Sequence, residues 1–303
     1  MPQIYRIGTR GSPLAMAQAR MVATALRDVH GWTADRIEIV PITTSGDLIR
    51  DRPLSEVGGK ALWTKELDRQ LIEGGTDMSV HSMKDVESVR PTELAIAAML
   101  PRADVRDRLI GAESLEALPP GARVGTSSPR REAQLLRRRP DLNIVPIRGN
   151  VETRLRKIET GEADATLLAA AGLDRLGRHE LGAVLEDFLP APAQGAVGVE
   201  VRAGDKRIHG LAAAIDDAAT HACVSAERRL LVGLGGDCHS PVAALAQLEG
   251  DSIRLRAEIL TGDGREMESC DALFGVDDET APVELARQLL ARASPALRAL
   301  FAR

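Results

Sequence analysis

The chain has 303 residues, of which 44% are hydrophobic and 27% are charged. This composition is ordinary for a globular protein and excludes a disordered chain, a collagen-like repeat and a coiled coil. At this length two or three domains are expected. The net charge of −5, with only two Trp, one Tyr and three Phe, argues against a general nucleic-acid binder, which needs basic patches and aromatic platforms.

The sequence shows no pattern typical of an exported or membrane protein. Residues 1–7 lack the basic flank and long apolar run of a signal peptide, and no run of about eighteen apolar residues could span a membrane. Cys223, Cys238 and Cys270 are an odd number at wide spacing, unlike the disulfide framework of a secreted domain. We therefore expect a cytoplasmic protein that binds neither membranes nor nucleic acids.

The N-terminal third alternates short apolar runs with helical patterns, as α/β proteins do. Residues 5–7 predict a strand, and apolar residues from 14 to 29 predict a helix. Ser12 suits the cap of this helix, Pro13 its first position and Gly31 its end. Further strands are predicted at residues 37–43, 78–81 and 94–100.

The same pattern occurs a second time. A strand ends at Val124, and Ser-Pro at 128–129 then opens a helix, as Ser-Pro does at 12–13. Gly-x-x-Asp at 74–77, between a helix and a strand, reappears at 161–164. Two similar lobes that present helix N-termini beside strand ends predict a ligand site in a cleft between them.

The last third has a different pattern. Apolar and polar residues alternate over 253–259, a turn follows at 261–264, and a second strand returns over 267–274. This predicts an antiparallel hairpin with one solvated face. A closing helix is predicted from Pro282 to Phe301. Together these elements indicate a small third domain.

Arginines at the ends of predicted elements are the first candidates for a binding site. Helix N-termini supply N–H groups and a positive dipole end, and arginine adds a planar fork that binds carboxylates or phosphates. Most single arginines are solvated surface charges, but repeated placement at strand-to-helix turns favours a ligand with several negative charges. The arginines placed in this way are Arg10, Arg130, Arg131, Arg148, Arg154 and Arg175.

Residues 81–85, with the sequence HSMKD, are the second candidate and end a predicted strand. The carboxylate of Asp85 beside Lys84 would stay ionised and could hold or move a proton next to a developing cation. The spacing of Ser82 and Asp85 also matches a helix capping box, which on spacing alone is the more common explanation.

Cys238 lies in the glycine-rich segment 235–241 and is the third candidate. Its thiolate could be a nucleophile or a covalent attachment point, although an ordinary loop cysteine is the default interpretation. His221, Cys223 and His239 raise the alternative of a metal site. Their spacing matches no zinc pattern, so no metal is expected.

Seven short motifs occur in the order seen in porphobilinogen deaminases, also called hydroxymethylbilane synthases, and the chain resembles that family over about residues 4–245. The motifs are TRGSPLA at 9–15, VGGK at 57–60, VHSMKD at 80–85, VGTSS at 124–128, RGN at 148–150, QGAVG at 194–198 and Cys238-x-x-Pro241.

The resemblance implies the fold of the family. The fold class is α/β, with two periplasmic-binding-protein-like (type II) lobes that contain mixed sheets and a small C-terminal α/β domain that carries a cofactor cysteine. Residues 1–100 and 196–215 would form the first lobe, residues 101–195 the second, and residues 216–303 the C-terminal domain. A monomer is expected, since three domains around one cleft need no partner.

The resemblance also implies the activity. The family joins four porphobilinogen molecules head to tail with loss of ammonia, giving the linear tetrapyrrole hydroxymethylbilane, and extends a dipyrromethane cofactor held by a thioether to a cysteine. Cys238 matches that cysteine. Asp85 matches the catalytic aspartate, which assists loss of the amino group and stabilises positive charge on the pyrrole nitrogens. The expected enzyme is a transferase of tetrapyrrole (porphyrin and haem) biosynthesis.

Other matched positions hold the acetate and propionate groups of the cofactor and the substrate. Those expected to bind the cofactor are Ser82, Lys84, Thr126, Ser127, Ser128, Arg130, Arg131, Arg148 and Gly149. Those expected to bind the substrate are Arg10, Ser12, Arg148, Arg154, Arg175 and Gln194. Each pyrrole brings two carboxylates, so an arginine-lined site in an acidic protein has a purpose.

The chain departs from the family pattern at several positions. Asp237 precedes the cysteine where glycine is usual, Pro129 stands where leucine is common, and Glu56 occupies a place that is often basic. Glu87-Ser88 replaces the proline that often follows the Lys-Asp-Val sequence, and this change is expected to alter the loop beyond Asp85.

Two other functional classes explain parts of the sequence. A non-catalytic two-lobed binding protein for an anionic ligand would account for the lobes and the arginines, but it leaves Cys238 and the third domain without a role. A phosphate-handling transferase is disfavoured, because Gly58-Gly59-Lys60 and Gly8-x-x-Gly11 complete no phosphate-loop fingerprint.

Overall fold

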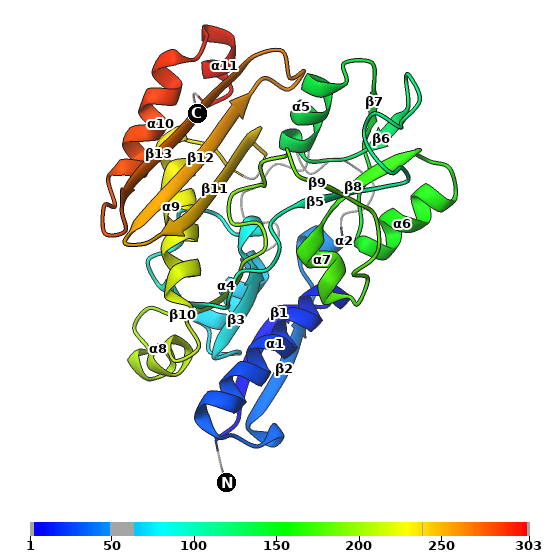
Figure 1. The fold of residues 1–303 in the computed structure, drawn as a ribbon. Helices are drawn as coiled ribbons and strands as arrows, with labels where there is room; N and C mark the ends of the chain where they lie inside the picture. The colour runs from blue at the N-terminus through cyan, green and yellow to red at the C-terminus, as the bar shows by residue number, and fades with distance from the viewer. Residues whose placement is uncertain (1–2, 49–63, 238, 302–303) are drawn as a thin grey trace. The chain divides into compact units, whose positions relative to one another are not determined.

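The computed structural model describes residues 3–48, 64–237 and 239–301 (Figure 1). The chain divides into two compact units, one formed by Met1–Ala103 with Gly195–His221 and the other by Asp104–Gln194 with Ala222–Arg303. The second unit therefore contains most of both the predicted second lobe and the predicted C-terminal domain. The three-domain boundaries stay a prediction.

The first unit is built on a five-stranded sheet of order β2-β1-β3-β10-β4. β1 (Tyr5–Arg10) pairs in parallel with β2 (Ile37–Ile42) and with β3 (Met78–Ser82). β10 (Val197–Arg202) runs antiparallel to both β3 and β4 (Leu94–Met99). The predicted strands of this region are confirmed. β10 lies between β3 and β4 in this sheet, although the whole second sheet separates it from them in the sequence.

The first helix begins and ends where the sequence predicts. In α1 (Pro13–His30), Ser12 is the N-cap and its Oγ accepts a hydrogen bond from the Ala15 N–H at 3.3 Å. Gly31 ends the helix in the left-handed region, with φ of 64°. Val22 and Leu26 of α1 pack into a core with residues of the sheet. Further helices among the described residues of this unit are α2 (Ser45–Leu48), α4 (Lys65–Ile72), α8 (Lys206–Ala213) and the short 3-10 helices Ala34–Arg36 and Met83–Asp85.

The second unit contains a sheet with the same design, of order β7-β6-β8-β5-β9. β6 (Arg123–Gly125) pairs in parallel with β7 (Asn143–Val145) and β8 (Ala165–Ala169), and β5 (Asp107–Ile110) runs antiparallel to β8 and β9 (Ala183–Leu185). Its helices are α5 (Pro129–Arg138), α6 (Val151–Glu159) and α7 (Ala170–Arg175). Both sheets are mixed and match strand for strand in order and direction, so the predicted α/β class with two similar lobes is confirmed.

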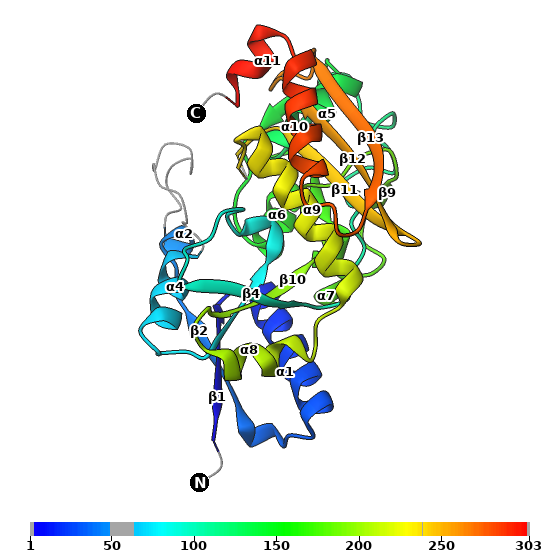
Figure 2. The same ribbon diagram turned by 90° about the vertical axis from the view of Figure 1, so that its left-hand side faces the viewer.

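The C-terminal part of the second unit is a three-stranded antiparallel sheet of β11 (Val242–Glu249), β12 (Ser252–Leu260) and β13 (Met267–Gly275). The predicted hairpin is therefore confirmed. α9 (Ala218–Leu234) and α10 (Ala281–Arg292) lie on one face of this sheet (Figure 2). Their buried side chains form a separate core with the inward residues of β11 and β12.

The prediction of one continuous helix to Phe301 is wrong. α10 ends at Arg292, Ala293 has extended backbone angles, and α11 (Pro295–Ala299) begins after the new cap Ser294. Pro295 disfavours helical geometry at the preceding residue and lacks an N–H to continue the helix. Within the described residues, no helix is both long and apolar enough to cross a membrane.

Candidate active site

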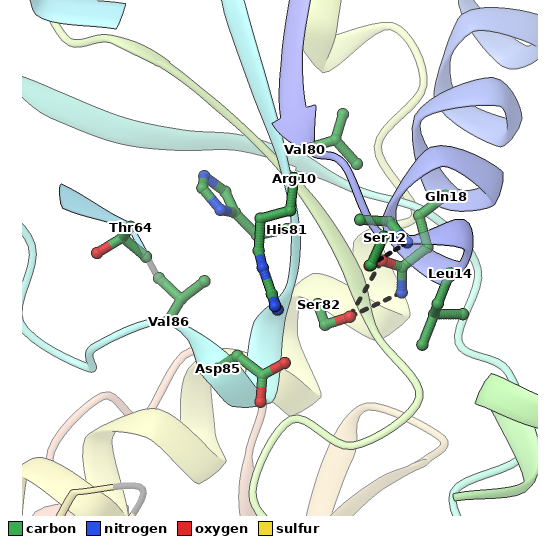
Figure 3. A pocket seen from close by; sticks show the side chains of 11 residues that line it. Arg10, Ser12, Leu14, Gln18, Thr64, Val80, His81, Ser82, Asp85 and Val86 are labelled. Carbon is green, nitrogen blue, oxygen red and sulfur yellow. Dashed lines mark hydrogen bonds between the residues drawn. The ribbon is translucent and has the colours of Figure 1, made fainter. Parts of the chain in front are cut away.

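A pocket lies in the first unit at the carboxyl ends of β1 and β3. It is lined by Arg10 at the end of β1, by Ser12 before α1 and Gln18 within that helix, by Ser82 at the end of β3, and by Asp85 after it. Adjacent parallel strands end at the same edge of a sheet, which brings these residues together. Figure 3 shows the Arg10 and Asp85 side chains pointing toward one another across the pocket.

Asp85 ends the 3-10 turn Met83–Asp85, and its side chain is half-buried. The turn is held at the start of β10, because the Met83 N–H donates at 3.1 Å to the carbonyl of Ala196, which directly precedes that strand. The Met83 side chain also packs over Gly198, where a Cβ would lie 2.2 Å from the Met83 sulfur. Gly198 therefore allows the Asp85 turn to lie directly against the sheet.

The capping-box interpretation of Ser82 and Asp85 is wrong. The Ser82 side chain makes no cap hydrogen bond; its hydroxyl instead accepts from Gln18 Nε2 at 2.8 Å. The turn is too short and too closely tied to β10 to be the first turn of an α-helix. Lys84 lies in the same turn and is half-buried.

Gln18 was missed in the sequence, although a signal was present. Its neighbours on the same face of α1, Ala15, Ala19 and Val22, are apolar and buried, and Gln18 itself is 1% exposed. A polar residue within an apolar helical stripe needs a hydrogen-bond partner. That partner is Ser82, at the edge of the pocket.

A buried charge cluster lies next to the pocket and was also missed. Glu200 of β10 is fully buried, and its carboxylate lies 3.2 Å from His81 Nε2 and accepts from Arg90 Nε at 2.8 Å. Burial alone would raise the pKa of Glu200, but hydrogen bonds from His81 and Arg90 lower it to about 2. The signal was one glutamate within the apolar strand sequence VGVEV at 197–201.

Glu87, which lies beyond Asp85 and departs from the family pattern, bonds to two side chains; that this departure alters the loop stays a prediction. Glu87 accepts from Arg90 Nη1 at 2.5 Å and from the Thr64 hydroxyl at 3.1 Å. Arg90 Nη2 also donates to Asp68 at 2.6 Å. Burial raises the pKa of Asp68, and the Arg90 charge opposes that rise.

In the second unit, predicted binding residues follow three adjacent parallel strands. Thr126, Ser127 and Ser128 come after β6, Arg148 and Gly149 come after β7, and Arg175 ends the short helix that follows β8. Since the strand order is β7-β6-β8, their carboxyl ends meet at one edge of the sheet. This edge corresponds to the pocket edge of the first sheet.

The hydroxyl groups at this edge shape the backbone. Thr126 Oγ1 accepts from the Ser128 N–H at 3.1 Å, and Ser127 Oγ donates to the Ile147 carbonyl at 3.0 Å. Ser128 is the N-cap of α5, and Pro129 occupies its first turn, as predicted.

The arginines around the start of α6 and at the end of α7 are half-buried. Arg154 Nε donates to the carbonyl of Gly149, which has a φ of 112° that favours glycine. Arg148 lies beside that glycine, and burial lowers the pKa of Arg175. That these arginines bind ligand carboxylates stays a prediction.

Three predicted ligand-binding residues instead converge on one buried carboxylate. Arg130 Nη2 donates to Asp107 at 2.8 Å, Arg131 Nη2 donates to it at 2.7 Å, and the Gln194 amide donates to it at 3.0 Å. Arg130, Arg131 and Asp107 are all at most 6% exposed. Burial would raise the pKa of Asp107, but the charges of Arg130 and Arg131 hold it well below its usual range. A role of these three donors in ligand binding stays a prediction.

Cys238, Glu56 and the VGGK motif at 57–60 lie outside the described residues. Cys223 is buried in the C-terminal core, and Cys270 lies on β13, where burial raises the pKa of its thiol. No group of side chains suited to a metal ion occurs in the described part of the chain.

The sequence matches two models of one protein family. Residues 5–210 match the dipyrromethane cofactor binding domain of porphobilinogen deaminase, and residues 221–292 match the C-terminal domain of porphobilinogen deaminase. The two matches together span most of the chain.

Curated relatives are similar over almost their full length. A porphobilinogen deaminase of Sphingopyxis alaskensis is 56% identical over 305 residues, covering 98% of this chain and 96% of the relative. Porphobilinogen deaminases of Paracoccus denitrificans and Nitrobacter winogradskyi are 50% and 48% identical, covering 95% and 98% of this chain and 94% and 96% of the relatives.

Solved structures of two-lobed binding domains are similar at a lower level. An ancestral cationic amino acid solute binding protein has a TM-score of 0.43 and 17% identity, covering 69% of this chain and 86% of that chain. A VFT2 domain of BvgS from Bordetella pertussis has a TM-score of 0.41 and 16% identity, covering 71% and 86%. The strand order of the two sheets, rather than this similarity, establishes the two-lobed fold. By its two family matches and its full-length relatives, the chain belongs to the porphobilinogen deaminase family.

Proposed function

We propose that this protein is a hydroxymethylbilane synthase, a transferase that joins four porphobilinogen molecules head to tail and releases one ammonia for each. One water molecule is consumed to give the hydroxymethyl group of the product, the linear tetrapyrrole hydroxymethylbilane, which is a precursor of porphyrins and haem. The observation that carries the proposal is the pocket in which Asp85 and Arg10 face one another, in a chain that belongs to this family.

The described residues fit a dipyrromethane cofactor. Such a group presents pyrrole N–H donors and carboxylates, so it needs a carboxylate acceptor together with cationic donors. Asp85 supplies the acceptor and Arg10 a guanidinium in one pocket, beside the N-terminus of α1. When bound, the cofactor supplies the terminal pyrrole carbon to which the first substrate is joined.

Asp85 is the catalytic residue in this proposal. Its carboxylate accepts a hydrogen bond from the pyrrole N–H of porphobilinogen. When the bond between the aminomethyl carbon and nitrogen breaks and ammonia leaves, positive charge develops on that pyrrole nitrogen. A fixed, half-buried carboxylate stabilises this charge more than water does, because it needs no reorientation. Arg10 and Ser12 hold the substrate carboxylates beside it.

The edge of the second sheet supplies further cationic donors. Arg148, Arg154 and Arg175 bind the acetate and propionate groups of the growing chain, with backbone N–H groups at the starts of α5 and α6. Each added pyrrole brings two more carboxylates, which accounts for several arginines rather than one.

The cofactor is attached through the sulfur of Cys238. The two other cysteines support this assignment by their surroundings. Cys223 is buried among apolar side chains, and Cys270 has a raised thiol pKa and therefore little thiolate at neutral pH. We also propose a monomer, since each of the three sheets has its own buried core within the chain.

The test is the intact mass of the purified protein, with a peptide map around Cys238 and an assay of porphobilinogen consumption. An added mass of two pyrrole units on that peptide, with turnover, supports the proposal. An unmodified chain that gains no mass and consumes no porphobilinogen overturns it. Binding without turnover would establish the non-catalytic two-lobed binding protein instead.

A further inference from the structure

The segment that follows Asp85 is fixed by one buried arginine. Arg90 precedes β4, and its side chain is 8% exposed although it is charged. A guanidinium buried to this extent needs anionic partners, and Arg90 has three. They are Glu200 of β10, Asp68 of α4 and Glu87 of its own loop.

Glu200 is the central partner, because it holds both sides of the Asp85 turn. On the side before the turn, its Oε2 lies 3.2 Å from Nε2 of His81. On the side after the turn, its Oε1 accepts from Arg90 Nε at 2.8 Å and its Oε2 accepts from Arg90 Nη2 at 3.0 Å. These two parallel hydrogen bonds restrain the orientation of the Arg90 guanidinium as well as its distance from the Glu200 carboxylate.

The backbone between these two ties carries the pocket residues Ser82 and Asp85. His81 itself lines the same pocket, on β3 opposite Gly198 of β10. The pairing of β3 with β10 fixes the start of the turn. Within the described part of the chain, residues 86–93 pair with no strand before β4 begins at Leu94. On the far side of Asp85, Arg90 therefore supplies the side-chain tie between this loop and Glu200 of β10. Glu87 adds a hydrogen bond from the Thr64 hydroxyl.

We propose that Arg90 and Glu200 are positioning residues for Asp85, acting through the turn that carries it rather than by contact with substrate. The inference rests on the proposed function for its catalytic consequence. A displacement of about 1 Å at a reacting group can lower a rate about 100-fold. Loss of Arg90 should accordingly lower kcat more than it raises KM, because Arg10 and Ser12 are not among the partners of Arg90.

The test compares Arg90→Met with Arg202→Met in the full-length purified enzyme. Arg202 is a matched control, since it is also a partly buried arginine with several bonds in the first unit. Arg202 donates to the Leu71 and Thr76 carbonyls at 2.8 Å and pairs with Asp205. It ends β10, whereas Ser82 pairs with Val197 at the other end of that strand. Both variants should unfold at a lower temperature than the wild type.

Only Arg90→Met should lower kcat, by about 10-fold to 100-fold, with KM for porphobilinogen changed less than about twofold. Hydrogen exchange without substrate should accelerate in residues 82–90 of Arg90→Met and not in Arg202→Met. Arg90→Lys keeps one charge but not the fork, so its kcat should lie between those of wild type and Arg90→Met. If Arg90→Met does not fold, Arg90→Lys alone must show lower kcat and faster exchange.

An unchanged kcat in Arg90→Met, or in Arg90→Lys if Arg90→Met does not fold, would overturn the proposal. Equal losses of kcat in Arg90→Met and Arg202→Met would also overturn it, because they would show a loss of stability alone. If wild type consumes no porphobilinogen, the proposed function fails. The exchange comparison then still decides whether Arg90 fixes the turn.

Discussion

Asp77 and Asp164 make the same pair of hydrogen bonds in the two units. The Asp77 N–H donates to the Arg6 carbonyl at 2.9 Å, and its Oδ2 accepts from the Arg6 N–H at 2.8 Å. Asp164 repeats these contacts with Arg123, at 2.8 Å and 2.7 Å. In each unit this exchange joins the starts of two adjacent parallel strands. The repeated Gly-x-x-Asp sequence therefore marks the same connection between two parallel strands in both units.

Replacement of Asp85 should abolish turnover and leave the fold intact. Asp85→Asn keeps the shape of the side chain but removes the negative charge, so kcat should fall by at least about 100-fold, the effect of losing one fixed charge-stabilising group. Circular dichroism and the unfolding temperature should match the wild type, because Asp85 is only half-buried. Steady-state kinetics provide the measurement. Wild-type kcat in Asp85→Asn would remove Asp85 from the mechanism.

Cys238→Ser should yield a protein without covalent cofactor, because an alcohol is a far weaker nucleophile than a thiolate at neutral pH. Intact mass after incubation with porphobilinogen checks this. Cys270→Ser is the matched control, and it should carry the same added mass as the wild type. Pyrroles that remain attached in Cys238→Ser would show that another residue holds the cofactor.

Local signals allowed most of the first lobe to be predicted. Ser12 and Gly31 mark helix ends through their own backbone and hydrogen-bonding properties, so no distant contact is needed. Pro295 also predicts a break, because proline disfavours a helical residue before it, whereas the apolar spacing that continues to Leu300 predicts one helix.

The partners of the buried charges could not be predicted in the same way. Asp107 and Arg131 are 24 residues apart, and Arg90 and Glu200 are 110 apart. Their pairing depends on the order of strands in the sheets, which periodicity does not specify. An arginine at a helix start looks the same in sequence whether its carboxylate belongs to a ligand or to the protein.

Asp107→Asn should destabilise the second unit strongly. It removes the charge shared by two buried guanidiniums, and breaking a buried ion cluster in this way costs about 3–5 kcal/mol. Asp164→Asn is a control in the same unit, because Asp164 pairs with Arg123 while 41% exposed, and solvent screens that pair, so its loss should change stability far less than the loss of Asp107. Urea unfolding of both variants measures the difference. If both variants lose the same free energy of unfolding, burial does not make the Asp107 ion cluster more stabilising than the exposed Asp164 pair.

Glu200 should contribute stability that disappears in acid. Its pKa in the folded protein is about 2, below the ordinary value of 4.5, so its contribution is present above about pH 4.5 and is lost as the pH falls toward 2. The raised pKa of Asp68 has the opposite sign and offsets part of this change. The free energy of unfolding of Glu200→Gln should fall below the wild-type value by about 3 kcal/mol near neutral pH. Urea unfolding at several pH values should show this difference shrinking in acid, and a constant difference would contradict it.

Gly264→Ala should loosen the contact between the C-terminal hairpin and α5. A Cβ at Gly264 would lie 2.3 Å from the Ala133 carbonyl oxygen and 2.6 Å from the Arg137 nitrogen, which are backbone atoms and cannot rotate away. Gly250→Ala in the preceding turn is the control, since its φ of 61° is close to the 70° of Gly264, but no described atom beyond its chain neighbours lies within 4 Å of a Cβ there. Gly250→Ala should cost about 1–2 kcal/mol for left-handed backbone strain alone. Gly264→Ala should cost about 1–3 kcal/mol more, because the hairpin must also move away from the helix. If urea unfolding shows that both variants lose the same free energy of unfolding, the close contact between Gly264 and α5 does not stabilise the protein.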